Sequence, residues 1–158
     1  MRRIATGKYY DEFEIGEVVT HAVTRTVTEA DNVMFTCLTM NPQPMHLDVE
    51  FAREHEFKLP LMNSLFILGL VVGIAVPELT HGTTIANLGF EEITFPAPVF
   101  AQDTIWVETE TLHKRLSKSR QDSGIVTLEH RGYNQNDKLV CKARRAALMR
   151  LAPNSASS

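Results

Sequence analysis

The chain has 158 residues, 44% of them hydrophobic and 22% charged, which fits a single globular domain with its own core. Its formal net charge of −3 gives no positive field that could hold a polyanion, so nucleic acid is excluded as an expected partner. Two cysteines, Cys37 and Cys141, cannot build a disulfide framework or a cysteine metal site, and a cytoplasmic protein with reduced thiols is expected.

The first part of the chain predicts one strand followed by two helices. Residues 17–28 alternate apolar and polar side chains, which is the period of a half-buried strand. Thr28 and Asp31 have the spacing of a capping box, so a helix is expected to follow as far as residue 38. Asp48 is placed to cap a second, short helix over residues 49–57.

The longest apolar run, LFILGLVVGIAV, covers residues 65–76. It is well below the length of about 18 residues that spans a bilayer, so no membrane association is expected. The run predicts a buried helix that begins near Asn63 and is stopped by Pro77. Gly69 and Gly73 lie four residues apart, on one face of this helix, where another backbone could approach closely.

The second half of the chain predicts strands, at residues 84–95, 103–113, 124–135 and 138–150. An irregularity is expected at Glu91 and Glu92, and a turn at residues 134–137. One strand, then helices, then four strands indicate an α+β fold, with an antiparallel sheet wrapped around a long central apolar helix. Residues 1–150 are expected to form one domain, and residues 151–158 a disordered tail.

The segment NPQPMHLD between the first two predicted helices has a histidine behind two prolines. Pro42 and Pro44 fix their own φ angles and bias Asn41 and Gln43 toward extended conformations. A stiff approach suits an imidazole that must hold one position for proton transfer, which makes His46 a candidate acid/base. The structural alternative is a rigid turn whose histidine only satisfies a backbone carbonyl.

The order of elements, with the segments LTMNPQPMHLD, NSLFILGLVVG, NLGFEEITFPAPVF and HRGYNQ, resembles the MaoC-like hydratases of the hot-dog fold. More narrowly, these four segments resemble the branch of the family that hydrates mesaconyl-CoA or itaconyl-CoA, two C5 dicarboxylic thioesters. The resemblance extends over residues 13–149 and implies a hot-dog domain that forms a homodimer or a higher homo-oligomer. It implies a hydratase or dehydratase that needs no metal or redox cofactor, with coenzyme A present only as part of the substrate.

The family motif runs aspartate, any residue, asparagine, proline, an aliphatic residue and histidine, and its aspartate and histidine share the acid/base work. His46 keeps the histidine position, whereas Gln43 stands where the asparagine would be. Asn41 stands in the aspartate position, and an amide can orient a water molecule but cannot take its proton. The resemblance therefore implies that Asn41 and Gln43 hold the water or the substrate carboxylate.

Two further sets of residues are candidates for substrate binding. The helix start at Asn63 and Ser64 resembles the family element in which a backbone amide polarises the thioester carbonyl, although Asn63 also fits a plain N-cap. Lys114 and Arg115 begin a basic stretch, predicted as a loop, that could hold the phosphates of coenzyme A. A solvated hairpin tip is the other interpretation of that stretch.

Two other functions stay open beside the hydratase. A hot-dog thioesterase usually needs a carboxylate on or near the central helix, and NSLFILGLVVG contains none. A non-catalytic acyl-CoA binding module is compatible with the missing aspartate at Asn41.

Overall fold

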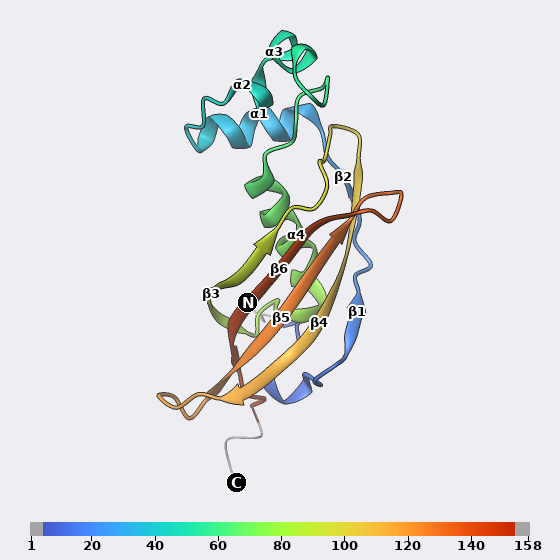
Figure 1. The fold of residues 1–158 in the computed structure, drawn as a ribbon. Helices are drawn as coiled ribbons and strands as arrows, with labels where there is room; N and C mark the ends of the chain where they lie inside the picture. The colour runs from blue at the N-terminus through green and yellow to red at the C-terminus, as the bar shows by residue number, and fades with distance from the viewer. Residues whose placement is uncertain (1–4, 154–158) are drawn as a thin grey trace.

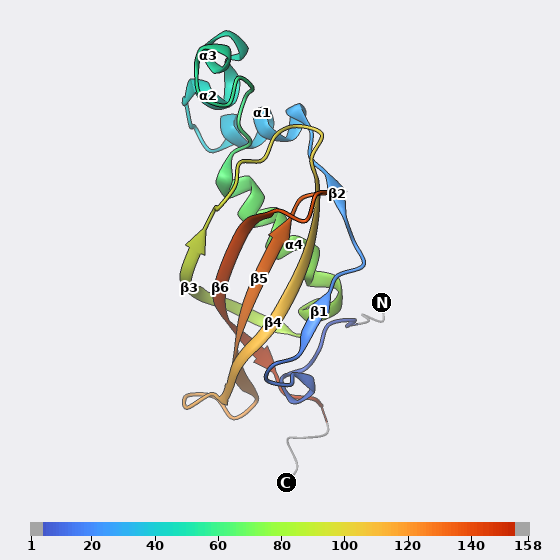
Figure 2. The same ribbon diagram turned by 45° about the vertical axis from the view of Figure 1, so that its right-hand side comes forward.

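The computed structural model describes residues 5–153 and has an α+β architecture. A curved antiparallel sheet wraps around the long helix α4 (Ser64–Leu79), and the shorter helices lie at one end of α4 (Figures 1 and 2). The strands of this sheet follow the order β1-β4-β5-β6-β3, so that β1 and β3 form its two edges. The predicted fold class is therefore confirmed.

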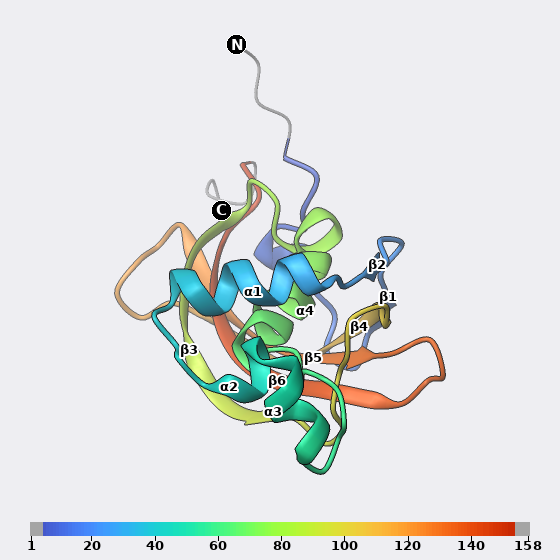
Figure 3. The same cartoon turned by 90° about the horizontal axis from the view of Figure 1, so that it is seen from above.

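The shorter helices are α1 (Glu29–Leu38), α2 (Pro44–Leu47) and α3 (Val49–Glu54). A 3₁₀ turn at Tyr10–Glu12 precedes them in the chain and lies at the opposite end of the molecule (Figure 1). The predicted capping box is present, because Thr28 Oγ1 accepts from the Asp31 amide and the Asp31 carboxylate accepts from the Thr28 amide. Asp48 caps α3 by accepting from the Phe51 amide. Viewed from above, α1 crosses over α4 (Figure 3).

The strands are β1 (Val18–Thr20), β2 (Arg25–Thr26), β3 (Thr84–Thr94), β4 (Thr104–Leu116), β5 (Ser123–Tyr133) and β6 (Leu139–Arg150). The single strand predicted for residues 17–28 is wrong, because it is divided into β1 and β2, which both pair with β4. The His21 amide still donates to the Val107 carbonyl of β4, and the pairing is interrupted at Ala22, whose amide donates to the Glu78 carboxylate instead.

The predicted irregularities of the later strands are largely present. The register of β3 against β6 shifts between Phe90 and Glu92, as expected, and it shifts at two further places that the sequence does not indicate. The predicted turn at residues 134–137 is confirmed by the hydrogen bond from the Asn134 amide to the Lys138 carbonyl. Asp137 has a positive φ of 56° within this turn.

Helix α4 packs its buried face against the sheet. Gly132 on β5 permits a close approach, since a Cβ at this position would lie only 2.5 Å from Val71 Cγ2. Gly69 and Gly73 do not serve this purpose: within residues 5–153, no heavy atom outside the helix's own neighbouring backbone and the adjacent residues would lie within 4 Å of a Cβ at either position. Leu65 on the same face is 60% exposed, so one side of the apolar helix is uncovered in the single chain.

Two predicted boundaries need correction. Helix α4 continues through Pro77 to Leu79, because a proline in the last turn removes only one helical hydrogen bond and the Thr80 amide still donates to Val76. The predicted tail does not begin at residue 151 as an unattached segment, since the Leu151 amide donates to the Asp122 carbonyl. Residues 154–158 of that predicted tail lie outside the described residues.

Candidate active site

The short helix α2 carries His46. Pro44 occupies its first position, where a missing amide costs no helical hydrogen bond, and Gln43 before it is extended (φ −64°, ψ 115°), as predicted. The half-buried imidazole places Nδ1 2.7 Å from the Leu61 carbonyl oxygen. A carbonyl only accepts, so Nδ1 carries the proton and Nε2 of the neutral ring keeps its lone pair. The carbonyl contact expected for a structural histidine is thus also the contact that leaves the Nε2 lone pair available to accept a proton.

The segment before α2 is held by Asn41. Its Oδ1 accepts from the Gln43 amide at 3.0 Å, and its own amide donates to the Thr36 carbonyl. Its Nδ2 has no acceptor within the described chain and is free to donate, whereas the Gln43 side chain is exposed. Asn41 and His46 therefore lie on one short, braced segment, and the side chain at position 41 can offer a donor but not a base.

Leu61 joins His46 to the N-terminus of α4, because its carbonyl oxygen accepts from the imidazole and it lies only three residues before Ser64. Asn63 is buried and caps the helix, with its Oδ1 accepting from the Leu65 amide at 3.0 Å, so the N-cap prediction is confirmed. Among residues 5–153 the Ser64 amide has no hydrogen-bond acceptor. An unpaired amide at the positive end of a 16-residue helix is suited to an oxygen that gains negative charge.

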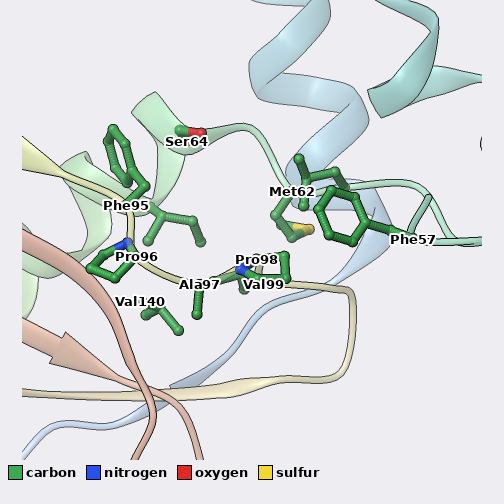
Figure 4. A pocket seen from close by; sticks show the side chains of 11 residues that line it. Phe57, Met62, Ser64, Phe95, Pro96, Ala97, Pro98, Val99 and Val140 are labelled. Carbon is green, nitrogen blue, oxygen red and sulfur yellow. The ribbon is translucent and has the colours of Figure 1, made fainter. Parts of the chain in front are cut away.

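A pocket of about 240 Å³ opens beside this helix start (Figure 4). Ser64 lines it from α4, and Phe57, which packs edge-on against Phe100 with ring centroids 5.9 Å apart, lines it from the loop before α4. Apolar side chains form the rest of the wall: Leu61, Met62, Ile67, Phe95, Pro96, Ala97, Pro98, Val99 and Val140. Such a wall suits an aliphatic part of a ligand more than a charged one.

Asn32 belongs to this site and is missed by the sequence reasoning. It lies on α1, and its side chain bonds to the backbone of His46, Leu61 and Asn63. These partners are 14 to 31 residues away in sequence. No local pattern indicates such contacts, since an asparagine within a helix is normally a solvated residue.

Lys114 and Arg115 are not brought together with His46. They lie on β4 and not in a loop, because β4 extends three residues beyond its predicted end, and that end of β4 is opposite to α1, α2 and α3 (Figure 1). The Lys114 ammonium donates to the Phe13 carbonyl at 2.7 Å and lies over the Tyr10 ring. Binding of coenzyme A phosphates by the pair stays a prediction.

A separate polar chain lies between α4 and the sheet. Arg145 Nε donates to His130 Nε2 at 2.9 Å, which leaves the His130 Nδ1 proton for Thr109 Oγ1 at 2.8 Å. The Thr109 hydroxyl can then donate to His21 Nε2, whose Nδ1 donates to Glu78 at 2.6 Å. Burial, together with the proximity of Arg145 and His21, holds the pKa of His130 well below its usual value.

The structure of residues 5–153 can be compared with what binding a metal ion or crossing a membrane requires. This part of the chain has no group of three or more histidine, cysteine, aspartate and glutamate side chains that could hold a metal ion. It also has no helix that is both long and apolar enough to cross a membrane. That no cofactor is needed stays a prediction.

The sequence profile of the family described as MaoC like domain matches residues 12–134. The chain belongs to the MaoC-like family. Curated proteins similar to this MaoC-like domain include a mesaconyl-CoA hydratase of Cereibacter sphaeroides (29% identical over 144 residues) and a beta-methylmalyl-CoA dehydratase of Chloroflexus aurantiacus (28% over 144 residues). Both alignments cover 91% of the chain but only 41% and 40% of those relatives. The chain thus spans about two fifths of the length of these two proteins.

A shorter relative is covered more fully. The (R)-specific enoyl-CoA hydratase of Aeromonas caviae is 29% identical over 111 residues, which are 70% of this chain and 78% of that protein. Among solved structures, an Archaeoglobus protein described as a monoamine oxidase regulatory protein is 32% identical, with a TM-score of 0.83 over 95% of this chain and 100% of its own. A Mycobacterium tuberculosis protein with a double hot-dog fold is 20% identical, with a TM-score of 0.84 over 94% of this MaoC-like domain and 46% of its own chain. The fold of this domain is the hot-dog fold.

Proposed function

We propose that this MaoC-like domain is a lyase that adds water reversibly across the double bond of an α,β-unsaturated acyl-CoA thioester. The observation that carries the proposal is the His46 imidazole, whose Nδ1 is engaged by Leu61 while Nε2 has no hydrogen-bond partner among residues 5–153. The names of relatives that are hydratases and dehydratases support the same reaction class.

The proposed reaction uses two groups of the chain. His46 Nε2 accepts a proton from water as the water oxygen bonds to the β-carbon, and the π electrons move onto the thioester oxygen. The Ser64 amide donates a hydrogen bond to that oxygen at the positive end of α4. His46 then gives the proton to the α-carbon, the electrons return, and one molecule of water has been added in total. Because Asn41 cannot carry a proton, both transfers fall to the one imidazole.

For the substrate we propose a short C5 dicarboxylic thioester, mesaconyl-CoA or itaconyl-CoA. With mesaconyl-CoA, the apolar pocket beside Ser64 would receive the methyl branch. With itaconyl-CoA, the methylene carbon is part of the double bond that takes up water and would lie at His46 instead. The second carboxylate would face Asn41 and Gln43, where the free Asn41 Nδ2 can donate to it. The names of the two first relatives, a beta-methylmalyl-CoA dehydratase and a mesaconyl-CoA hydratase, support the mesaconyl group.

Two alternatives make different predictions. A thioesterase would hydrolyse the thioester at its carbonyl carbon and would need a carboxylate near Ser64. The carboxylate that α4 carries, Glu78, lies at the other end of the helix and is bound to His21. An acyl-CoA binding module would hold the thioester without changing it.

One assay separates the three functions. The protein is incubated with mesaconyl-CoA, and in parallel with crotonyl-CoA, while the enoyl absorbance and the release of free thiol are followed. A hydratase lowers the absorbance without releasing thiol, a thioesterase releases thiol, and a binding module does neither. Unchanged absorbance with both substrates would contradict the proposal.

The proposal includes a cytoplasmic homodimer. Strand β3 is an unpaired edge, and Leu88, Phe90 and Ile93 on it are exposed apolar residues. Such an edge would pair with the same edge of a second copy, since a two-fold axis places two β3 strands antiparallel. The free thiols of Cys37 and Cys141 fit a reducing compartment.

A further inference from the structure

Asn32 is 2% exposed and makes three hydrogen bonds through its side-chain amide, each to a backbone group of another segment. Its Nδ2 donates to the carbonyl oxygens of His46 at 3.1 Å and Leu61 at 3.0 Å. Its Oδ1 accepts from the Asn63 amide at 2.8 Å. One side chain on α1 thus joins the backbone of α2, the loop before α4 and the N-cap of α4.

The Leu61 carbonyl oxygen is shared between Asn32 and His46. It accepts from Asn32 Nδ2 and, at 2.7 Å, from His46 Nδ1, so both of its lone pairs are engaged. This oxygen determines which nitrogen of the His46 ring carries the proton. Asn32 therefore fixes the acceptor that selects the tautomer, and through the His46 carbonyl it also fixes the backbone that carries the ring.

The third hydrogen bond acts on the other reacting group. The Asn63 amide held by Asn32 belongs to the residue directly before Ser64, so the direction of the Ser64 amide depends on how Asn63 is held. The Asn63 side chain is also braced, with Nδ2 donating to Thr36 Oγ1 at 3.2 Å. The amide of Asn32 thus contacts the supports of both the proposed base and the proposed oxyanion donor.

We propose that Asn32 is a positioning residue, which sets the tautomer of His46 and the orientation of the Ser64 amide together. Its effect on turnover rests on the proposed function, whereas its effect on the imidazole does not. An aspartate at this position would still accept from Asn63, but its second oxygen would face the two carbonyl oxygens of His46 and Leu61. A leucine would leave all three buried backbone groups without a partner.

The first test measures the tautomer directly by ¹⁵N NMR of histidine-labelled protein, at a pH above the range in which imidazoles titrate. In the wild type the His46 proton should reside on Nδ1, and the His46→Ala variant identifies the signals. In Asn32→Asp the ring should show a mixture of both tautomers, because the Leu61 oxygen is displaced. Asn32→Ser, with a small neutral side chain, takes its place should the aspartate variant not fold.

The matched control is Thr36→Val, which keeps the shape of a buried residue of α1 and removes a hydrogen bond to Asn63 without touching Leu61. Its His46 spectrum should equal that of the wild type. A wild-type proton on Nε2, or a spectrum unchanged in Asn32→Asp, would overturn the proposal.

The second test is kinetic. Asn32→Asp should lower kcat by about 10²-fold, the size of effect that a small misplacement of reacting groups has, with KM changed by less than about threefold. Thr36→Val should lower kcat much less. A folded Asn32→Asp variant with wild-type kcat would overturn the proposal. If the wild type itself has no hydratase activity, the proposed function fails, while the NMR measurement still decides the role of Asn32.

Discussion

At the scale of single residues, a neutral imidazole can carry its proton on either nitrogen until a hydrogen bond to one of them selects the tautomer. At His46 the Leu61 carbonyl engages Nδ1 and leaves Nε2 available. Between Asn41 and His46 the segment reads NPQPMH, so this ring is its one ionisable side chain. The acid/base chemistry proposed for this segment therefore depends on a single group.

Replacing His46 with alanine should lower turnover by about 10² to 10⁴, the usual effect of removing an acid/base group. Stability should change little, because the ring is half-buried and makes one side-chain hydrogen bond. The matched control is His55→Ala, at an exposed histidine at the end of α3 that packs on Phe51. Turnover within about threefold of the wild type in His46→Ala would make the ring structural.

Asn41→Asp should weaken use of mesaconyl-CoA or itaconyl-CoA relative to crotonyl-CoA. A carboxylate can still accept from the Gln43 amide, so the turn is kept, but it would repel the free carboxylate of a dicarboxylic substrate. The measurement is the ratio of kcat/KM values for a dicarboxylic and an uncharged substrate, in wild type and variant.

A charge control for this variant is Gln121→Glu, which adds the same charge at an exposed side chain in the loop between β4 and β5, away from the proposed site. Solvent and salt should screen that charge, so the substrate ratio should move less. Should the ratio stay constant in Asn41→Asp, or move toward the dicarboxylic thioester, charge avoidance does not explain the asparagine.

The site residues that the sequence predicts and those that it misses differ in how far apart their contact partners lie in the sequence. His46, Asn41 and the N-cap Asn63 belong to local motifs whose spacing is visible in the sequence. Asn32 acts only through partners that the tertiary fold brings to it, and its own helix would form equally well without it.

At the scale of the elements, the polar chain from Arg145 to Glu78 ties the C-terminal end of α4 to the interior of the sheet. His130 in this chain is fully buried and donates to Thr109, while it accepts from Arg145. Both of its nitrogens are engaged in the neutral state, so a proton added to Nε2 would displace the Arg145 contact. This explains why the folded protein disfavours protonation there.

The free energy of unfolding should fall when the pH is lowered from about 6.5 toward 5.5. His130 stays neutral in the folded state because its pKa is well below its usual value, whereas the unfolded chain takes up a proton below about pH 6.5. One such group gives a slope that rises toward about 1.4 kcal/mol per pH unit as the unfolded-state histidine becomes fully protonated. Denaturant titrations at several pH values measure this slope.

The variant His130→Gln should flatten the slope, and His113→Gln, at an exposed histidine of β4, should not. Protonation of Glu78 should not contribute to the slope of the unfolding free energy between about pH 6.5 and 5.5. Burial opposes its ionisation, but hydrogen bonds from Ala22 and His21 outweigh burial and hold its pKa below 4.5, so its contribution is lost only in stronger acid. An equal slope in wild type and His130→Gln would contradict the assignment.

The elements themselves are predictable where one local period dominates. The alternation of residues 104–113 and the apolar run of α4 indicate a strand and a helix without tertiary knowledge. The gap between β1 and β2 is different, because the alternation continues through His21 and only the contact of Ala22 with Glu78 interrupts the pairing. Pro77 likewise marks a helix end in general but falls within the last turn here.

At the scale of the whole molecule, the two edges of the sheet are unlike. Strand β1 has three residues, whereas β3 has eleven and exposes Leu88 (50%), Phe90 and Ile93. A long edge with apolar side chains is a surface that monomeric proteins normally shorten, charge or cover. The uncovered face of α4 at Leu65 adds apolar surface that one chain leaves in solvent.

The protein should therefore have twice the mass of one 17.8 kDa chain in solution at micromolar concentration. Leu88→Lys places a charge on β3 and should shift the equilibrium toward the monomer, because pairing of two β3 edges would bring two such charges together. Val18→Lys makes the same change at an exposed apolar residue on the other edge, β1, and should leave the mass unchanged. Sedimentation velocity of the three proteins decides between these outcomes. A wild-type particle of 17.8 kDa would contradict the dimer, and equal dissociation by both lysines would show that β3 is not the specific contact.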